Sequence, residues 1–302
     1  MSAADLNLLQ RPNDRLRRRR LVNLGMEVLA WLAAAIAVAI LGIVVWSVAK
    51  KGAGALNLDL FTKSQANASL FGGPVRQGLA NAFVGTLIVV GLATLMALPF
   101  GILIAIYVNE FAPRAIKSLV GLTLDVLAGV PAIVIGIFVF SLIVVAHGQS
   151  AYAGGFALAV IMLPFVARAT IEVLALVPNS LREAALGVGA PRWRVTLGVV
   201  LPQTIGGVLT GATLAVARVA GETAPLLFTC SLLQTPGTHA NPAQPLRTIP
   251  VSIFELSESA STDDQALAWA GALVLILFIL FASLGARWLA TRSRRKMLGA
   301  VR

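Results

Sequence analysis

The sequence has few of the residues on which soluble enzymes depend. Its 302 residues include one cysteine, Cys230, which excludes an internal disulfide, and two histidines that are far apart. Charged residues make up 12% of the chain, against roughly 25% in a typical soluble domain. The patterns GxxxxGK[ST], HExxH, CxxC and GxSxG, which serve nucleotide binding, metal binding and hydrolysis, are all absent. With no nucleophile beside a base and no metal-ligand group, we expect that this chain is not an enzyme.

Long apolar runs are abundant instead. Hydrophobic residues make up 58% of the chain, and a helix needs about 20 consecutive apolar residues to cross a membrane. The longest charge-free run, 126–167, is divided by the polar and glycine-rich stretch HGQSAYAGG at 147–155. The sequence therefore predicts an all-α integral membrane protein with six spans, near residues 25–49, 79–108, 118–146, 154–177, 203–233 and 265–288.

Lysine and arginine are distributed unevenly between the two sides of the predicted membrane. If both termini are cytoplasmic, the cytoplasmic segments hold 17 of these residues and the outer segments hold 5, in agreement with the positive-inside rule. The net charge of +11 therefore indicates topology rather than nucleic-acid binding. The predicted order is a basic cytoplasmic tail, a first span, an outer segment, a membrane core with a cytoplasmic loop at 178–194, and a second basic tail, at residues 1–24, 25–49, 50–77, 78–290 and 291–302.

Two of the spans contain an arginine and a glutamate. Arg168 precedes Glu172 by four residues, and Arg218 precedes Glu222 by four, so a continuous helix would place each pair on one face. An ionisable side chain at a helix centre costs about 2.5–3.5 kcal/mol on insertion scales, and such residues therefore line a protein interior or a wet path. Each pair is either a self-neutralising contact between packed helices or part of a translocation path, to which Thr223 would add a hydroxyl.

Other residues in the spans indicate breaks and close contacts. Asp125 is expected to be a helix-end residue or a partner for an arginine. The stretch GVLTG at 207–211 predicts close helix contact through small residues. Prolines inside apolar runs predict kinks, because each removes a backbone hydrogen bond. Packing alone could explain any one of these features, but together they favour a moving or path-forming bundle over a plain anchor. The prolines are Pro99, Pro131, Pro164 and Pro225.

The loop between the fourth and fifth spans reads LREAALGVGAPRWRVTLGVVLP at 181–202. It predicts a short amphipathic helix on the inner membrane surface, with Ser180 as N-cap and Glu183 completing a capping box. A rigid helix held between two spans can transmit force to them if a soluble partner grips it, or it can simply seal the loop. The residues expected to end the helix are Gly187, Gly189 and Pro191.

The same loop resembles the permeases of ATP-binding-cassette importers. Their pattern is EAA, three residues, Gly, nine residues and Ile-x-Leu-Pro, and this chain has Glu183-Ala184-Ala185, Gly189 and Val199-Val200-Leu201-Pro202 at the same spacing. In that family the helix is the coupling helix, which docks in a cleft of the ATPase subunit. The resemblance implies that Arg182 and Glu183 face the ATPase or brace the helix, while Gly189 permits the turn.

A second stretch, ARVAGETAPLLFT at 217–229, resembles the A-type permeases of the Pst phosphate importers. Segments at 72–87, 98–111, 128–138 and 248–256 resemble them as well, so the similarity covers about residues 70–300. The differences are conservative, such as Ala132 where serine is common.

The resemblance implies the type I importer fold and a set of partners. These are a homologous C-type permease, two ATPase subunits that bind ATP and Mg, a soluble phosphate-binding protein and the lipid bilayer, with no cofactor in this chain. The implied location is a bacterial or archaeal plasma membrane, crossed several times, with both termini cytoplasmic. The segment 247–258 either receives the binding protein or only connects helices. The open alternatives are a permease for phosphonate, molybdate or sulfate, and a secondary transporter that works alone.

Overall fold

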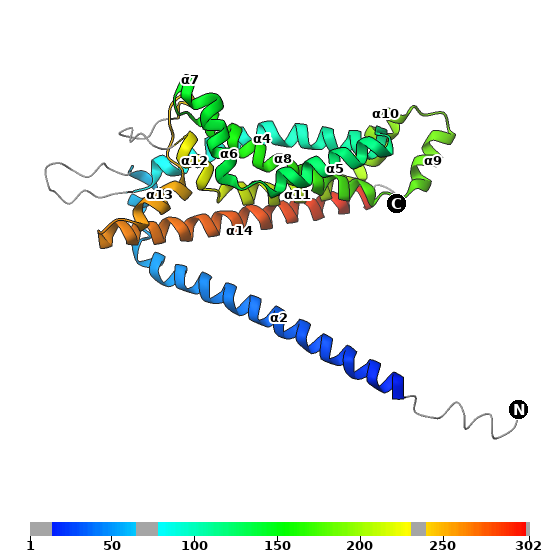
Figure 1. Cartoon of the computed structure of the whole chain (residues 1–302), viewed down its shortest axis with the longest axis horizontal. Helices are drawn as coiled ribbons and strands as arrows, with labels where there is room; N and C mark the ends of the chain where they lie inside the picture. Colours follow the sequence, from blue (N-terminus) through cyan, green and yellow to red (C-terminus); the bar gives the residue numbers. More distant parts are fainter. Residues whose placement is uncertain (1–13, 65–77, 231–239, 300–302) are drawn as a thin grey trace, which may run out of the picture. The chain divides into compact units, whose positions relative to one another are not determined.

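The computed structural model of the chain describes residues 14–64, 78–230 and 240–299. All regular structure in these segments is helical (Figure 1). The chain divides into two compact units, Met1–Lys50 and Lys51–Arg302. Helix α2 (Asp14–Gly52) accounts for the described part of the first unit and ends at the start of the second. The second unit contains, in order, η1 (Ala53–Ala55), α3 (Leu58–Thr62), α4 (Ala80–Ile106), η2 (Tyr107–Phe111), α5 (Arg114–Gly129), α6 (Ala132–Val139), η3 (Phe140–Val144), α7 (Val145–His147), α8 (Ala151–Ala175), α9 (Asn179–Gly187), α10 (Arg192–Val195), η4 (Thr196–Val200), α11 (Leu201–Ala220), α12 (Ala224–Thr229), α13 (Ile249–Ser257) and α14 (Thr262–Gly299).

Five helical segments among the described residues are long and apolar enough to cross a membrane. A sixth span results if α5 and α6, which meet at an angle of 93°, are counted together. The prediction of an all-α membrane fold with six spans is thus confirmed, although the third span is a bent pair rather than one helix. The five segments are Arg17–Ala55, Ala80–Phe111, Ala151–Ala175, Arg192–Ala220 and Thr262–Gly285.

Two of the four prolines act differently from the prediction. Pro99 and Pro164 lie inside α4 and α8 as expected. Pro131 instead occupies the N-cap position of α6, and Pro225 lies in the first turn of α12. A proline in either place begins a helix, because the N–H group that it lacks has no partner in a first turn. The expectation of four kinked helices is wrong for these two.

The fifth predicted span is also shorter at its end than expected. Helix α11 ends at Ala220, and a break separates it from α12, although the apolar sequence continues. In a continuous helix the ring of Pro225 would clash with the carbonyl of Gly221, four residues earlier. The predicted end of this span, residues 231–233, lies outside the described residues.

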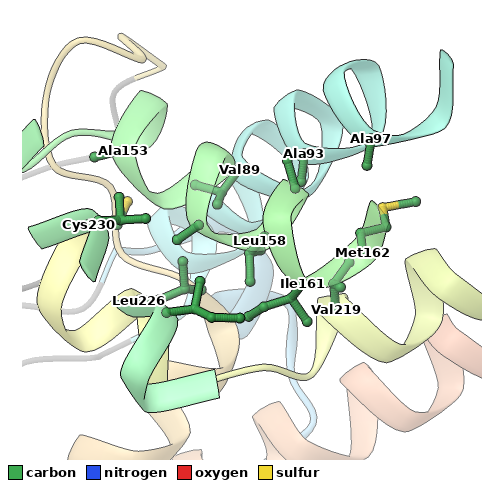
Figure 2. Packing of buried hydrophobic residues seen from close by; sticks show 14 of the residues in the cluster. Val89, Ala93, Ala97, Ala153, Leu158, Ile161, Met162, Val219, Leu226 and Cys230 are labelled. Atoms are coloured by element: carbon green, nitrogen blue, oxygen red, sulfur yellow. The ribbon is translucent and has the colours of Figure 1, made fainter. Parts of the chain in front are cut away.

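The core of the second unit is built on close contact between α4 and α8. Figure 2 shows Val89, Ala93 and Ala97 of α4 close to Leu158 and Met162 of α8. The small residues continue along one face of α4 at intervals of four. They let the backbones approach closely: a Cβ added at Gly101 would lie 2.8 Å from Val166 Cγ1, and one at Gly155 would lie 2.8 Å from Leu92 Cβ. The buried residues of this face are Val89, Ala93, Ala97, Gly101 and Ala105.

Helix α11 packs against α8 through the glycines of GVLTG. A Cβ at Gly207 would lie 2.6 Å from Val173 Cγ1, and one at Gly211 would lie 2.6 Å from Ala169 Cβ. The prediction of close helix contact through this segment is confirmed. Since α8 also contacts α4, it is the central helix of the second unit, and both α4 and α11 are positioned by it.

The two ends of this helical bundle carry different short helices (Figure 1). Helices α9 and α10 lie at one end, where a small apolar cluster fills the space beneath them. Helices α7, α12 and α13 lie at the other end. The cluster beneath α9 and α10 consists of Ala105, Leu174, Val177, Val195 and Val200.

Candidate functional site

The predicted amphipathic helix in the loop after the fourth span is α9. It begins at Asn179, directly after Pro178, and no side chain caps its N-terminus. The prediction of a capping box at Ser180 and Glu183 is therefore wrong, because the helix starts one residue before Ser180. The side chain of Glu183 is exposed, as is Ala184.

The turn after α9 depends on Gly189. This residue has a φ of +86°, a backbone conformation that side chains with a Cβ resist. The N–H of Gly189 donates to Leu186 O at 2.9 Å, and the N–H of Ala190 donates to Ala185 O at 3.3 Å. These two bonds form a Schellman motif, which satisfies carbonyls at the end of the helix. The prediction that Gly189 permits the turn is confirmed.

Arg182 braces α9 against the body of the protein. Its Nη2 lies 2.9 Å from Glu110 Oε1, and its Nε lies 3.2 Å from Glu110 Oε2. The same guanidinium donates to Val177 O at 2.6 Å and to Leu174 O at 2.9 Å. Only 16% of the Arg182 side chain and 9% of the Glu110 side chain are exposed. Of the two roles considered for Arg182, its contacts support bracing.

The remaining residues of the motif divide between surface and interior. Ala185 is half-buried and packs against the apolar cluster beneath α9, whereas Ala184 and Glu183 face outward. A cavity of about 220 Å³ lies beside the brace, and Glu110, Arg182, Arg192 and Thr196 contribute to its lining. Among the described residues, α9 therefore has an exposed outer face and an inner face that is fixed to the bundle.

Arg168 does not pair with Glu172. It forms an ion pair with Asp125 of α5 and donates from Nη2 to Gly121 O at 2.5 Å. Glu172, one turn further along α8, is exposed. The predicted pair on one helix face is not formed, because Arg168 extends toward α5. The expectation that Asp125 could be the partner of an arginine is confirmed.

Arg218 and Glu222 are separated by the end of a helix. Arg218 lies in the last turn of α11, whereas Glu222 and Thr223 lie in the break before α12. The i,i+4 geometry expected of one helix face is therefore absent. Arg218 instead places its guanidinium carbon 4.2 Å from the centre of the Phe165 ring on α8. Within the described part of the chain, Glu222 is not within ion-pair distance of an arginine or lysine.

The five candidate path residues are thus not gathered into one cluster by contacts within this chain. Arg168 is directed to α5, and Arg218 is directed to the Phe165 side of α8. Sequence reasoning missed Phe165 as the partner of Arg218, and it missed Glu110 as the partner of Arg182. In the sequence, Glu110 and Phe165 are a single acid and a single aromatic residue in apolar surroundings. Neither lies at a short helical spacing from its arginine that would indicate a contact.

At the other end of the bundle, residues 249–257 form helix α13 rather than a solvated loop. Thr86 of α4 accepts a hydrogen bond from Ile249 N at 2.8 Å, so a neighbouring helix caps α13. Arg247 forms an ion pair of 3.0 Å with Glu255 on α13 itself. This helix is firmly held against α4 and α14, and only part of its surface is open.

Curated relatives resemble the chain over most of its length. It is 40% identical to the phosphate transport system permease protein PstA of Xylella fastidiosa over 281 residues, 92% of this chain and 96% of that protein. It is 40% identical to PstA of Haemophilus influenzae over 78% of this chain and 82% of that protein. A probable PstA of Methanocaldococcus jannaschii is also 40% identical, over 67% and 72%.

Solved structures with the same fold are permeases of ATP-binding-cassette transporters. A bacterial transporter that imports the acidic polysaccharide alginate matches with a TM-score of 0.58 at 16% identity, over 92% of this chain and 97% of that one. The methionine transporter MetNI matches with a TM-score of 0.55, over 70% and 93%. The family described as binding-protein-dependent transport system inner membrane component matches residues 97–295. The chain belongs to this family of inner-membrane transport components.

Proposed function

We propose that the chain is one of two permease subunits of an ATP-driven importer of inorganic phosphate. The observation that carries this proposal is the 40% identity, over 92% of the chain, to a protein named a phosphate transport system permease. The similar region is long enough to include the break between α11 and α12, where Arg218, Glu222 and Thr223 lie. The family match alone supports a role in binding-protein-dependent transport and does not identify the substrate.

The coupling part of this function falls to α9. Its exposed face, which includes Glu183 and Ala184, would dock with one subunit of an ATPase dimer that binds ATP and Mg. The inner face is held by Arg182, and the Schellman turn at Gly189 fixes the direction in which the chain leaves the helix. A short helix that is exposed on one side and rigidly attached on the other suits the transfer of movement from a soluble subunit.

The translocation part is assigned to Arg218 with Glu222 and Thr223, and Arg168 and Glu172 are its secondary candidates. Arg218 is exposed on the surface of this single chain, where a homologous C-type permease would complete the path. Its planar set of donors suits phosphate oxygens. Glu222 can accept the proton that phosphate still carries near neutral pH, whereas sulfate has none to donate. The pair would therefore favour phosphate electrostatically, while a soluble phosphate-binding protein sets most of the selectivity.

The proposed orientation places both termini in the cytoplasm. Helices α9 and α10 would then face the ATPase, and α7, α12 and α13 would face the binding protein outside the plasma membrane of a bacterium or archaeon. The excess of Lys and Arg in the segments assigned to the cytoplasm supports this orientation.

Uptake in cells tests the proposal. The chain is expressed with its ATPase, its second permease and its binding protein in a bacterium that lacks phosphate importers, and uptake of radiolabelled phosphate is measured. We expect uptake that unlabelled phosphate suppresses and that a tenfold excess of sulfate, molybdate or phosphonate does not. Suppression by one of these other oxyanions would indicate a different substrate. Uptake by the chain expressed alone would indicate a secondary transporter.

A further inference from the structure

The most densely bonded charged group among the described residues is the Arg182 guanidinium. Its bonds reach three separate parts of the second unit: Glu110 in η2, the carbonyls of Leu174 in α8 and of Val177 just after it, and Asn179 of its own helix α9. The carbonyls in the last turn of a helix have no partner within that helix. Arg182 supplies one, so a single side chain connects the adjacent ends of α4 and α8 to α9.

The partner Glu110 lies directly after α4, where the helix changes geometry. Glu110 belongs to a π-helical turn, in which Ala112 N donates to Tyr107 O over five residues. Such a turn is an interruption of regular α-helix and is frequent at functional sites. Glu110 holds the guanidinium with both carboxylate oxygens, which fixes its orientation as well as its position.

The hydrogen bonds of Arg182 indicate the direction of transmission. They reach Glu110, just after α4, and two carbonyls at the end of α8, so a displacement of α9 is passed to these two helix ends. Arg182 and Glu110 also line a cavity together with Arg192 and Thr196 at the start of the next span. Glu183, the neighbour of Arg182, has an exposed side chain. Glu183 can therefore contact a partner while Arg182 attaches the helix to the bundle.

We propose that Arg182 and Glu110 form a joint that transmits movement of α9 to the ends of α4 and α8, and that Arg182 is a positioning residue that does not contact the ATPase. This inference rests on the proposed function, because it requires an ATPase that moves α9. It assigns a role to Glu110, which lies 72 residues away from Arg182 in the chain.

The test uses the complete complex in proteoliposomes and compares Arg182→Lys, Arg182→Gln and Glu110→Gln with the wild type. Lysine keeps the charge but replaces the planar fork with one point donor. We expect the ATPase to co-purify in the wild-type ratio, while the amount of solute imported per ATP hydrolysed falls about fivefold or more. The matched control is Lys117→Gln, which removes an exposed bond to Asn109 O of the same turn and should leave this ratio unchanged.

The double variant Arg182→Gln with Glu110→Gln covers the case in which a single change prevents folding. It removes both charges. If the two residues only neutralised each other's charge, this variant would import the wild-type amount of solute per ATP hydrolysed. We expect stable assembly with a low ratio, because the bonds to the α8 carbonyls are still lost. A wild-type ratio in this variant or in Arg182→Lys, or loss of ATPase binding in Arg182→Gln, would overturn the joint. ATPase co-purification does not depend on the solute, so a wild-type complex that binds ATPase but takes up no phosphate would refute the proposed substrate alone.

Discussion

Replacing Gly189 with valine is the sharpest change that the structure offers for the exposed helix α9. The residue has a φ of +86°, and a Cβ added to it would meet nothing within 4 Å. The cost of the substitution is therefore one of backbone conformation, about 1–3 kcal/mol for a residue other than glycine. A cost of about 2 kcal/mol corresponds to roughly a 30-fold shift away from the native turn.

The expected result is a loss of coupling rather than a loss of folding. Without the turn, the two bonds from Gly189 N and Ala190 N to the end of α9 are broken, and the helix loses its fixed direction. We expect the complex with Gly189→Val to insert and to hydrolyse ATP, but to show little stimulation of ATP hydrolysis by the loaded binding protein. The assay is phosphate-dependent ATP hydrolysis in proteoliposomes, measured together with uptake.

Two matched variants separate backbone strain from a steric effect on docking. Gly187→Val adds the same side chain two residues earlier, also into open space, at a position without positive φ. Gly189→Asn adds a side chain of similar size that tolerates positive φ. We expect both to remain coupled. Normal coupling in Gly189→Val, or equal loss in Gly189→Asn, would refute the conformational argument.

Three further predictions follow from contacts elsewhere in the second unit. Arg218→Gln should abolish phosphate uptake. It should change the free energy of unfolding by no more than about 1 kcal/mol, because the exposed guanidinium contacts an aromatic ring. Uptake that returns when Glu222→Gln is added would contradict a role of Arg218 in the path. Thr86→Val should lower the free energy of unfolding by about 1–2 kcal/mol and speed amide exchange at the start of α13, because the hydroxyl that caps this helix is lost. Thr86→Ser keeps the hydroxyl and should change neither quantity, so equal exchange in both variants would contradict the capping role. Cys230, fully buried with Sγ 3.1 Å from Leu246 O, should resist a membrane-permeant maleimide until the protein is unfolded in detergent, and rapid labelling of the folded complex would contradict this packing.

Much of the fold could be predicted from the sequence, because a membrane span is encoded locally. Charge-free runs of sufficient length identified the six spans, and the small residues of GVLTG identified the contact between α11 and α8. The turn at Gly189 was predictable for the same reason, since positive φ depends on the residue itself.

The breaks within spans were less accessible, although the residues that cause them were visible. Pro131 and Pro225 were assigned as kinks, but each begins a new helix. Hydrophobicity alone cannot distinguish a bent span from a broken one, because both present the same apolar surface. The consequence was an incorrect pairing of Arg218 with Glu222 on one helix face.

Which arginine pairs with which acid could not be predicted from one sequence, although Asp125 was a candidate partner. Arg168 had a candidate four residues away in Glu172, yet it pairs with Asp125 on another helix. Arg182 pairs with Glu110 through a contact that exists only after α4, α8 and α9 have packed. Such pairings depend on tertiary structure, so spacing along the chain carries no signal for them.

The proposed importer function is tested most directly by ATP-driven phosphate uptake with the purified four-component complex in proteoliposomes. We expect labelled phosphate to accumulate only when ATP is present on the ATPase side and the loaded binding protein is present on the opposite side. We also expect Arg218→Gln in this chain to abolish that accumulation without disassembling the complex. Accumulation without ATP, or accumulation of sulfate in place of phosphate, would contradict the assignment as an ATP-driven phosphate importer.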